Sequence, residues 1–234
     1  MVYFQHHPSK TSCFAGPGFL WSRVFYYITH EPMRKLAFFI DGFNLYHAIK
    51  DNKSLHKYKW LDLAKLCRSF CRADDAIQEI FYFTAYATFK PDGMERHKAY
   101  VRVLESKGVK PIFGEFKRKD KFCYSCKKFT QSYEEKETDV NIAIKLFQTA
   151  IHDLYDMAYI ISGDSDLIPA IRAVKETFSA KTIGVVIPIG RRAEALKQAA
   201  HFHMKMKRKH LETCQLPDQI NLDGKVITRP ETWK

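Results

Sequence analysis

Short apolar runs alternate with segments of helical periodicity along most of the chain. A continuous apolar run is typical of a strand that is buried on both faces of a parallel sheet. Runs of this kind occupy residues 35–41, 76–86, 108–116, 157–163 and 181–189. Apolar side chains recur at roughly helical spacing within residues 44–49, 60–70, 92–107, 137–154 and 166–177. Strands separated by helices predict a doubly wound, mainly parallel α/β sheet with right-handed crossovers.

The two ends of the chain lack these patterns. Residues 1–33 are rich in aromatic side chains and contain one acid and two basic residues, with no helical or strand period. We expect them to form an unstructured extension, and Met33 is a candidate start of the protein. Residues 217–234 are polar and contain two prolines, so a mobile C-terminal tail is expected. One globular domain over residues 34–216 is therefore predicted.

The charge balance favours an anionic partner. The chain has 38 Lys and Arg against 26 Asp and Glu, which gives a formal net charge of +12. Such a balance is typical of proteins that bind polyanions, although charge alone does not identify nucleic acid. The six cysteines are scattered, and the sequence has neither a cleavable secretory signal nor an apolar run of membrane-spanning length. We expect a cytoplasmic protein with no membrane partner.

Carboxylates are predicted to converge at one edge of the sheet. Asp41 and Asp164 lie at the ends of strands, Asp166 begins a helix, and Asp139 heads the apolar stripe of another helix. Helices that follow strands begin at the carboxyl edge of the sheet, where ligands bind. Each acid alone is also explained as a helix cap, but capping does not explain the convergence. Carboxylates so close need cations, and an all-oxygen site suits Mg²⁺ or Mn²⁺ rather than zinc.

Three motifs carry a resemblance to a known family. "FIDGFNLY" (39–46), "EEKETDVNIAI" (134–144) and "SGDSDLIPAI" (162–171) occur in this order. Together they resemble the NYN domain, a branch of the PIN-like nuclease superfamily, over about residues 34–207. The resemblance implies a compact α/β nuclease fold with metal ions at the carboxyl edge, acting mostly on RNA. It also implies that Asp41, Asp139, Asp164 and Asp166 are metal ligands, and that Asn44 orients Asp41 or contacts the scissile phosphate.

We therefore expect a metal-dependent ribonuclease that hydrolyses phosphodiester bonds, in single-stranded RNA. Of two Mg²⁺ or Mn²⁺ ions, one would activate a water for in-line attack and the other would stabilise the leaving oxygen. The alternative is a catalytically inactive RNA-binding or adaptor module on the same fold. A haloacid-dehalogenase phosphatase is disfavoured, because it needs a second Asp two residues after the first and Phe43 stands there.

Basic residues are predicted to bind the nucleic acid. The segment "KRKDKFCYSCKK" (117–128) interleaves aromatic side chains with the cations Lys117, Arg118, Lys119, Lys121, Lys127 and Lys128. It predicts a loop that clamps a single strand, or else a solvated flexible loop. Arg191 and Arg192 follow the last apolar run and are expected to hold a phosphate. Cys123 and Cys126 have zinc-knuckle spacing, but no second pair completes four ligands, so zinc is a weaker hypothesis.

Overall fold

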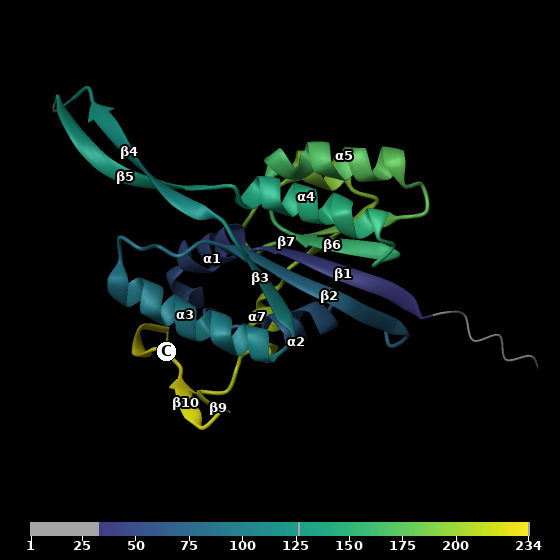
Figure 1. Cartoon of the computed structure of the whole chain (residues 1–234), viewed down its shortest axis with the longest axis horizontal. Coiled ribbons are helices and arrows are strands. Elements are labelled where there is room, and N and C mark those ends of the chain that lie inside the picture. The colour runs from purple at the N-terminus through teal and green to yellow at the C-terminus, as the bar shows by residue number, and fades with distance from the viewer. Residues whose placement is uncertain (1–32, 126, 234) are drawn as a thin grey trace, which may run out of the picture. The chain divides into compact units, whose positions relative to one another are not determined.

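The central sheet is built from the apolar runs of the sequence (Figure 1). The computed structural model describes residues 33–125 and 127–233, without the side chains of Lys121 and Cys123. Six strands have the order β3-β2-β1-β6-β7-β8, and every neighbouring pair is parallel. They are β1 (Arg34–Asp41), β2 (Asp75–Thr84), β3 (Val109–Phe113), β6 (Met157–Ile161), β7 (Thr182–Ile187) and β8 (Phe202–Lys205). The prediction of a doubly wound parallel sheet is confirmed.

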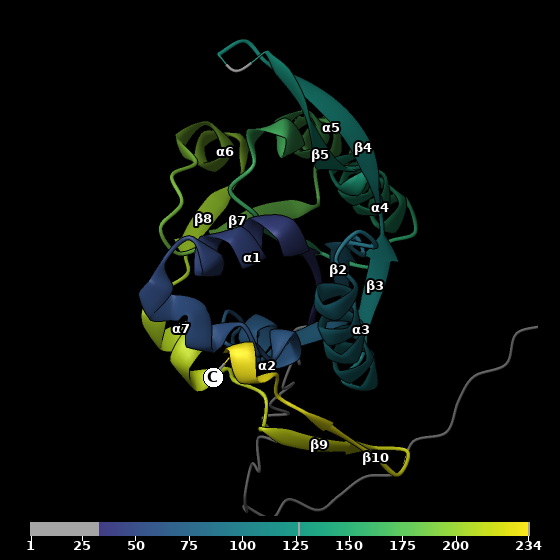
Figure 2. The same cartoon turned by 90° about the vertical axis from the view of Figure 1, so that its left-hand side faces the viewer.

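Helices cover both faces of this sheet (Figure 2). One face carries α1 (Gly42–Lys50), α2 (Leu63–Arg68), α3 (Pro91–Ser106) and α7 (Arg208–Thr213). The other face carries α4 (Thr138–Ile151), α5 (Ile168–Thr177) and α6 (Glu194–Ala199). The short 3-10 helices are η1 (Lys53–Tyr58), η2 (Ser165–Leu167) and η3 (Glu231–Trp233). None of the helices in the described part of the chain is long and apolar enough to cross a membrane.

Strand β1 shows why the apolar runs are continuous. Leu36, Phe38 and Ile40 point into the core on the α1 side, and all three are fully buried. Ala37 and Phe39 point into the core on the α4 side and are equally buried. Because successive side chains of a strand point to opposite faces, a strand between two cores has no solvated face. The sheet therefore divides the interior into two apolar layers.

The order in which successive strands are added to the sheet reverses at β1, near its centre. From β1 the chain runs outward through β2 to β3, and it then returns to β6 on the other side of β1 before continuing to β7 and β8. The carboxyl ends of β1 and β6 therefore lie side by side, with connections that leave in opposite directions. Such a switch point is where open α/β sheets bind ligands.

Residues 117–128, which were expected to form a loop, belong instead to a hairpin over residues 115–136. Strands β4 (Glu115–Cys123) and β5 (Lys128–Lys136) pair antiparallel and project away from the central sheet (Figure 1). Phe122 faces Phe129 across the pair, and Arg118 faces Tyr133. Because side chains two residues apart on a strand share a face, the aromatic residues of the hairpin lie on one face, together with Arg118 and Asp120.

The C-terminal segment is folded, in contrast to the tail expected from its polar composition. It contains β9 (Gln219–Leu222), β10 (Lys225–Thr228) and η3. The Trp233 ring lies 6.0 Å from that of Trp60, and the Trp60 indole donates a hydrogen bond of 2.8 Å to the Pro217 carbonyl. One tryptophan at the end of the segment therefore supplies an apolar anchor. The expected extension over residues 1–33 lies, apart from Met33, outside the described residues and stays a prediction.

Candidate functional site

Asp41 ends β1 at the switch point and is only 4% exposed. Its Oδ1 accepts a hydrogen bond of 2.9 Å from the Asn44 backbone N–H, so it caps α1. Its Oδ2 accepts a hydrogen bond of 2.7 Å from the Ser162 hydroxyl. Burial raises the pKa of Asp41 to about 6, although the two hydrogen bonds lower it. The negative charges of Asp164 and Glu135 raise the pKa to a smaller extent. A buried carboxylate is therefore held in place between β1 and β6 at an energetic cost.

The loop after β6 is tied to Asp41 and to α1. The Ser162 hydroxyl accepts a hydrogen bond of 3.0 Å from the Asp164 backbone N–H. The Asn44 side-chain oxygen accepts one of 3.0 Å from the Gly163 N–H. Asn44 thus positions the Gly163 loop with its side chain and contacts Asp41 only through its backbone. A serine that sequence reasoning did not select links the two strand ends.

Asp164 and Asp166 occupy the start of the short helix η2. Asp164 Oδ1 accepts a hydrogen bond of 3.0 Å from the Asp166 N–H, so the capping interpretation of Asp164 has a geometric basis. Asp166 lies in the first turn of η2 and is exposed, while Asp164 is half-buried. Within the described part of the chain, one carboxylate oxygen of Asp164 and both oxygens of Asp166 accept no hydrogen bond. Capping therefore leaves oxygen atoms available for a ligand.

Asp139 joins this acidic site from α4. It lies in the first turn of the helix and is half-buried. Burial, followed by the negative charges of nearby acids, raises its pKa to about 6, and these acids are Asp164, Asp41, Glu135 and Asp166. Mutual effects of this kind require the acids to be near one another. The structure therefore brings Asp41, Asp139, Asp164 and Asp166 into one neighbourhood.

Glu135 is a further acid of this neighbourhood that sequence reasoning missed. It lies at the end of β5, and its Oε1 accepts a hydrogen bond of 3.1 Å from the Thr138 N–H as well as one from the Thr138 hydroxyl. It thereby helps to begin α4 and contributes to the raised pKa of both Asp41 and Asp139. The available signal was its position four residues before Asp139, within the same motif.

The donor chemistry of the acidic site suits a hard divalent cation, but the spacing of the side chains does not enclose one. In residues 33–125 and 127–233, no three His, Cys, Asp or Glu side chains are close enough to hold a metal ion. Asp41 is fixed by hydrogen bonds, whereas Asp139, Asp164 and Asp166 are accessible. Metal binding would therefore require the accessible carboxylates to turn toward Asp41.

The predicted cations occupy two places. The aliphatic part of Arg191 lies close to Gly163, whose Cβ, if present, would be 3.3 Å from that of Arg191. Its guanidinium pairs with Asp51 at 2.9 Å, whereas Arg192 is exposed. Arg191 thus borders the acidic site. The other predicted cations lie on the hairpin: Lys117, Arg118, Lys119, Lys121, Lys127 and Lys128.

Neighbouring acids already neutralise part of the hairpin. Lys117 pairs with Glu115 at 2.7 Å and Lys119 with Glu134 at 2.9 Å. Lys127 and Lys128, at the tip, are exposed and make no ion pair with any described residue. Cys126 and the side chain of Cys123 lie outside the described part of the chain, so the zinc hypothesis is untested. The tip therefore offers the less neutralised cations of the hairpin.

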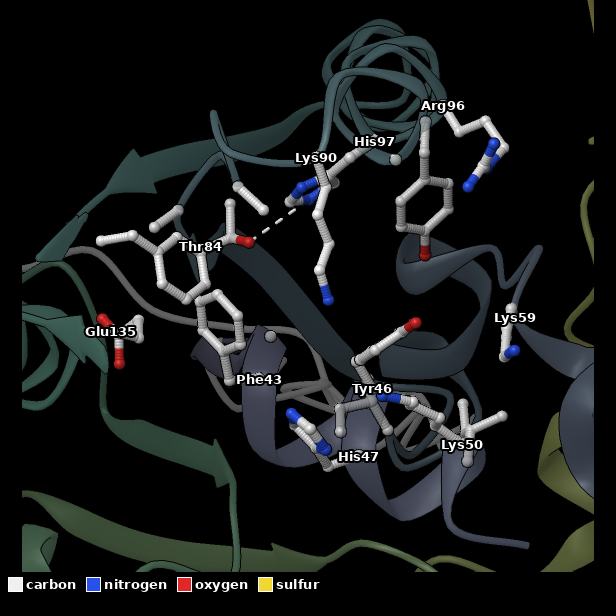
Figure 3. A pocket seen from close by; sticks show the side chains of 18 of the residues that line it. Phe43, Tyr46, His47, Lys50, Lys59, Thr84, Lys90, Arg96, His97 and Glu135 are labelled. Atoms are coloured by element: carbon white, nitrogen blue, oxygen red, sulfur yellow. Dashed lines mark hydrogen bonds between the residues drawn. The ribbon is translucent and has the colours of Figure 1, made fainter. Parts of the chain in front are cut away.

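A pocket of about 840 Å³ opens beside the acidic site, between α1, α3 and the base of the hairpin (Figure 3). Gly42 and Phe43, which follow Asp41 directly, line it, as does Glu135. Its volume is within the range of about 300–1,000 Å³ that is usual for small-ligand sites. Its walls combine aromatic rings with cationic side chains, and no such pocket was expected from the sequence.

Known proteins resemble this chain in sequence and in fold. A 6-hydroxy-3-succinoylpyridine 3-monooxygenase of Pseudomonas putida is 26% identical over 246 aligned positions, which cover 87% of this chain and 76% of that protein. The solved structure of a Vibrio parahaemolyticus protein of unknown function matches with a TM-score of 0.55 at 14% identity. That match covers 76% of this chain and 96% of the other, and at this identity it shows the fold alone.

The family assignment rests on a match that spans most of the folded chain. Residues 35–207 match the NYN domain. They contain the three sequence motifs, the whole central sheet except Arg34, and every acid of the site described above. NYN domains are typically nucleases that use divalent metal ions. The resemblance noted in the sequence is confirmed, and the chain belongs to the NYN domain family.

Proposed function

We propose that this protein is a metal-dependent ribonuclease that hydrolyses single-stranded RNA at the acidic site. The observation that supports this most strongly is the gathering of Asp41, Asp139, Asp164 and Asp166 at the switch point, where the pKa values of two of them are raised to about 6. Carboxylates held together at an energetic cost are typical of functional sites. Membership of the NYN family supports a hydrolase of this kind.

The protein groups have separate roles in this proposal. Asp41 is the fixed carboxylate, since Ser162 and the start of α1 hold both of its oxygens. Asp139, Asp164 and Asp166 are the accessible carboxylates that would complete the binding of Mg²⁺ or Mn²⁺ around it. A bound divalent ion supplies an activated water and neutralises charge on the phosphate. Asn44 keeps the Gly163 loop against α1, so that Asp164 stays near Asp41.

The hairpin is the proposed RNA-binding arm. Phe122 and Phe129 form a ring pair at 5.0 Å and are 41% and 73% exposed. Lys127 and Lys128 lie between them in the chain. Exposed rings stack on unpaired bases and lysines neutralise phosphates, which together favour single strands over duplexes.

The decisive test compares Asp164→Asn with the wild type. The asparagine keeps an oxygen that can accept the Asp166 N–H and so preserves the helix cap, but it removes one charge from the site. End-labelled single-stranded RNA is incubated with Mn²⁺, with Mg²⁺ or with EDTA. We expect cleavage by the wild type with metal only, and a loss of at least about a hundredfold in the variant.

Asp223→Asn is the matched control. Asp223 is exposed in the turn between β9 and β10, with a φ of 51° that asparagine also adopts readily. The control should cleave like the wild type. Full activity of Asp164→Asn would contradict the nuclease proposal at this site. Binding of RNA without cleavage by the wild type would instead support an inactive RNA-binding module.

A second candidate is oxidation of a small heteroaromatic acid, which the name of the Pseudomonas relative suggests. The pocket beside the acidic site favours it, because aromatic rings and cations suit such a molecule. Oxygen consumption that depends on 6-hydroxy-3-succinoylpyridine, measured in the presence of an electron donor, would support this candidate. Absence of consumption together with metal-dependent RNA cleavage would exclude it as the main activity.

A further inference from the structure

The pocket beside the acidic site has an aromatic wall formed by three elements. Tyr133, at the base of the hairpin, stacks on Phe89 with ring centroids 3.8 Å apart and an angle of 6° between the planes. Phe116 meets the edge of Phe89 at 5.2 Å and that of Phe43 at 5.3 Å. The rings therefore support one another and hold the base of the hairpin against α1 and the segment before α3. A rigid aromatic wall of this kind suits a flat ring.

Cationic side chains line the same pocket, and one of them, Lys90, has its ammonium 5.6 Å from the centroid of the Phe89 ring. Lys50 and Lys59 both lie over the Tyr46 ring, each with its ammonium 5.9 Å from the centroid. The Lys90 amine reaches into the middle of the pocket, and Arg96 lies at its edge (Figure 3). None of these four cations forms an ion pair with a carboxylate in residues 33–125 or 127–233. Unneutralised cations around one cavity indicate an anionic ligand.

His97 adds a neutral polar group to the same pocket. Its Nε2 lies 3.3 Å from the Thr84 hydroxyl, as the dashed line in Figure 3 marks. Burial lowers the pKa of His97 to about 4, so the imidazole is uncharged near neutral pH. A neutral imidazole can donate or accept a hydrogen bond. The pocket therefore offers ring stacking, positive charge and a neutral hydrogen-bonding group together.

We propose that this pocket binds one nucleotide of the RNA substrate beside the cleaved bond, with its base against the Phe89–Tyr133–Phe116 wall and its phosphate among Lys50, Lys59, Lys90 and Arg96. The inference rests on the proposed ribonuclease function and assigns a substrate position to it. Its location follows from the chain, because Gly42 and Phe43 of the pocket directly follow Asp41 of the acidic site. A ring joined to an anion is the shared chemistry of a nucleotide and of a small heteroaromatic acid, and the test separates these sources.

The test measures binding directly, so that it does not depend on cleavage. Isothermal titration with adenosine 5′-monophosphate in EDTA should give a dissociation constant at least about tenfold lower than adenosine or ribose 5-phosphate gives. The pocket variant Lys90→Gln/Arg96→Gln should bind the monophosphate at least about tenfold more weakly than the wild type does. The control Lys53→Gln/Arg102→Gln removes the same charge from η1 and α3, outside the pocket, and should bind like the wild type.

Three results would overturn the inference. The first is equal binding by the pocket variant and its control. The second is tight binding of ribose 5-phosphate, because the aromatic wall would then have no role. The third is binding of nicotinate, a pyridine ring with one carboxylate, that is as tight as that of the monophosphate and equally sensitive to the pocket variant. If the monophosphate binds as expected but RNA is not cleaved, the pocket assignment holds and the ribonuclease proposal fails.

Discussion

Replacing Asp41 by Asn should stabilise the metal-free protein at neutral and alkaline pH. Burial raises the pKa of Asp41 from 3.8 to about 6. Its ionised form is therefore less favourable in the folded than in the unfolded protein, and stability is lost as the pH rises through this range. Asparagine carries no charge, and its oxygen can still accept the Asn44 N–H. Ser162 can accept a hydrogen bond from the new amide.

The size of the effect follows from the shift. About two pKa units at about 1.4 kcal/mol per unit correspond to about 3 kcal/mol when both states are ionised. The side chain is only 4% exposed, so solvent screening reduces this little. The same relation gives an advantage of about 1.5 kcal/mol at pH 5 and about 3 kcal/mol at pH 8. For a domain of this size, the latter raises the unfolding midpoint by about 6–12 °C.

The assay is thermal unfolding of both proteins in EDTA at pH 5 and at pH 8. Asp75→Asn is a control that should change stability in the opposite direction. Asp75 is as buried as Asp41, but its carboxylate pairs with Arg34 at 2.6 Å. Losing this pair should destabilise the protein by about 1–3 kcal/mol. An Asp41→Asn variant that is less stable than the wild type at pH 8, or whose advantage does not change with pH, would refute the electrostatic reasoning.

Three other changes probe packing and RNA binding. Gly184→Ala should lower the free energy of unfolding in urea by about 1–3 kcal/mol, because the added Cβ would lie 2.1 Å from the Phe202 ring. Deleting residues 217–234 should lower the thermal midpoint by several degrees, because the buried Trp60 indole loses its acceptor at Pro217. Phe129→Ala should weaken binding of single-stranded RNA by about 1–3 kcal/mol in a filter-binding or anisotropy assay.

Each of these changes has a control or a contradicting outcome. The control for Gly184→Ala is Gly93→Ala in α3, where the added Cβ would lie no closer than 3.7 Å to another side chain. This change should stabilise the protein by about 0.5–1 kcal/mol. A shortened chain that melts like the wild type would show that the C-terminal segment does not support the core. Val226→Ala removes an exposed apolar side chain from β10, 61% exposed, and should leave RNA affinity unchanged. Equal affinities of the Val226 and Phe129 variants would exclude base stacking on Phe129.

The parallel sheet was predictable because burial on both faces leaves a strong signal in the sequence. Strand β8 (Phe202–Lys205) was missed, since its four residues alternate between half-buried and exposed at the edge of the sheet. The hairpin was missed because five successive charged residues, 117–121, fill both faces of β4 and leave no alternation of apolar and polar positions. The C-terminal segment was misjudged for a related reason. Trp233 contacts Trp60 and Tyr100 from far along the chain, and composition does not show which residue a lone tryptophan will meet.

Much of the acidic site was predictable from topology. The rule that strands end and helices begin at one edge of the sheet places four carboxylates in one neighbourhood. Ser162 and Glu135 were missed because their roles depend on partners, Asp41 and Thr138, that only the folded geometry identifies. The pocket could not be predicted from the sequence either. Its wall joins α1, the segment before α3 and the base of a hairpin that had been expected to be a loop.

The position of β1 at the centre of the sheet has a consequence for how the protein is made. Asp41 and its partner Ser162 are 121 residues apart in the chain. At about 5–20 residues per second, β6 leaves the ribosome about 6–24 s after β1. During that time the half-sheet β3-β2-β1 exposes one edge of a strand that is apolar on both faces, which is a template for aggregation. Chains that terminate before Met157 should therefore aggregate rather than accumulate as a folded half-domain.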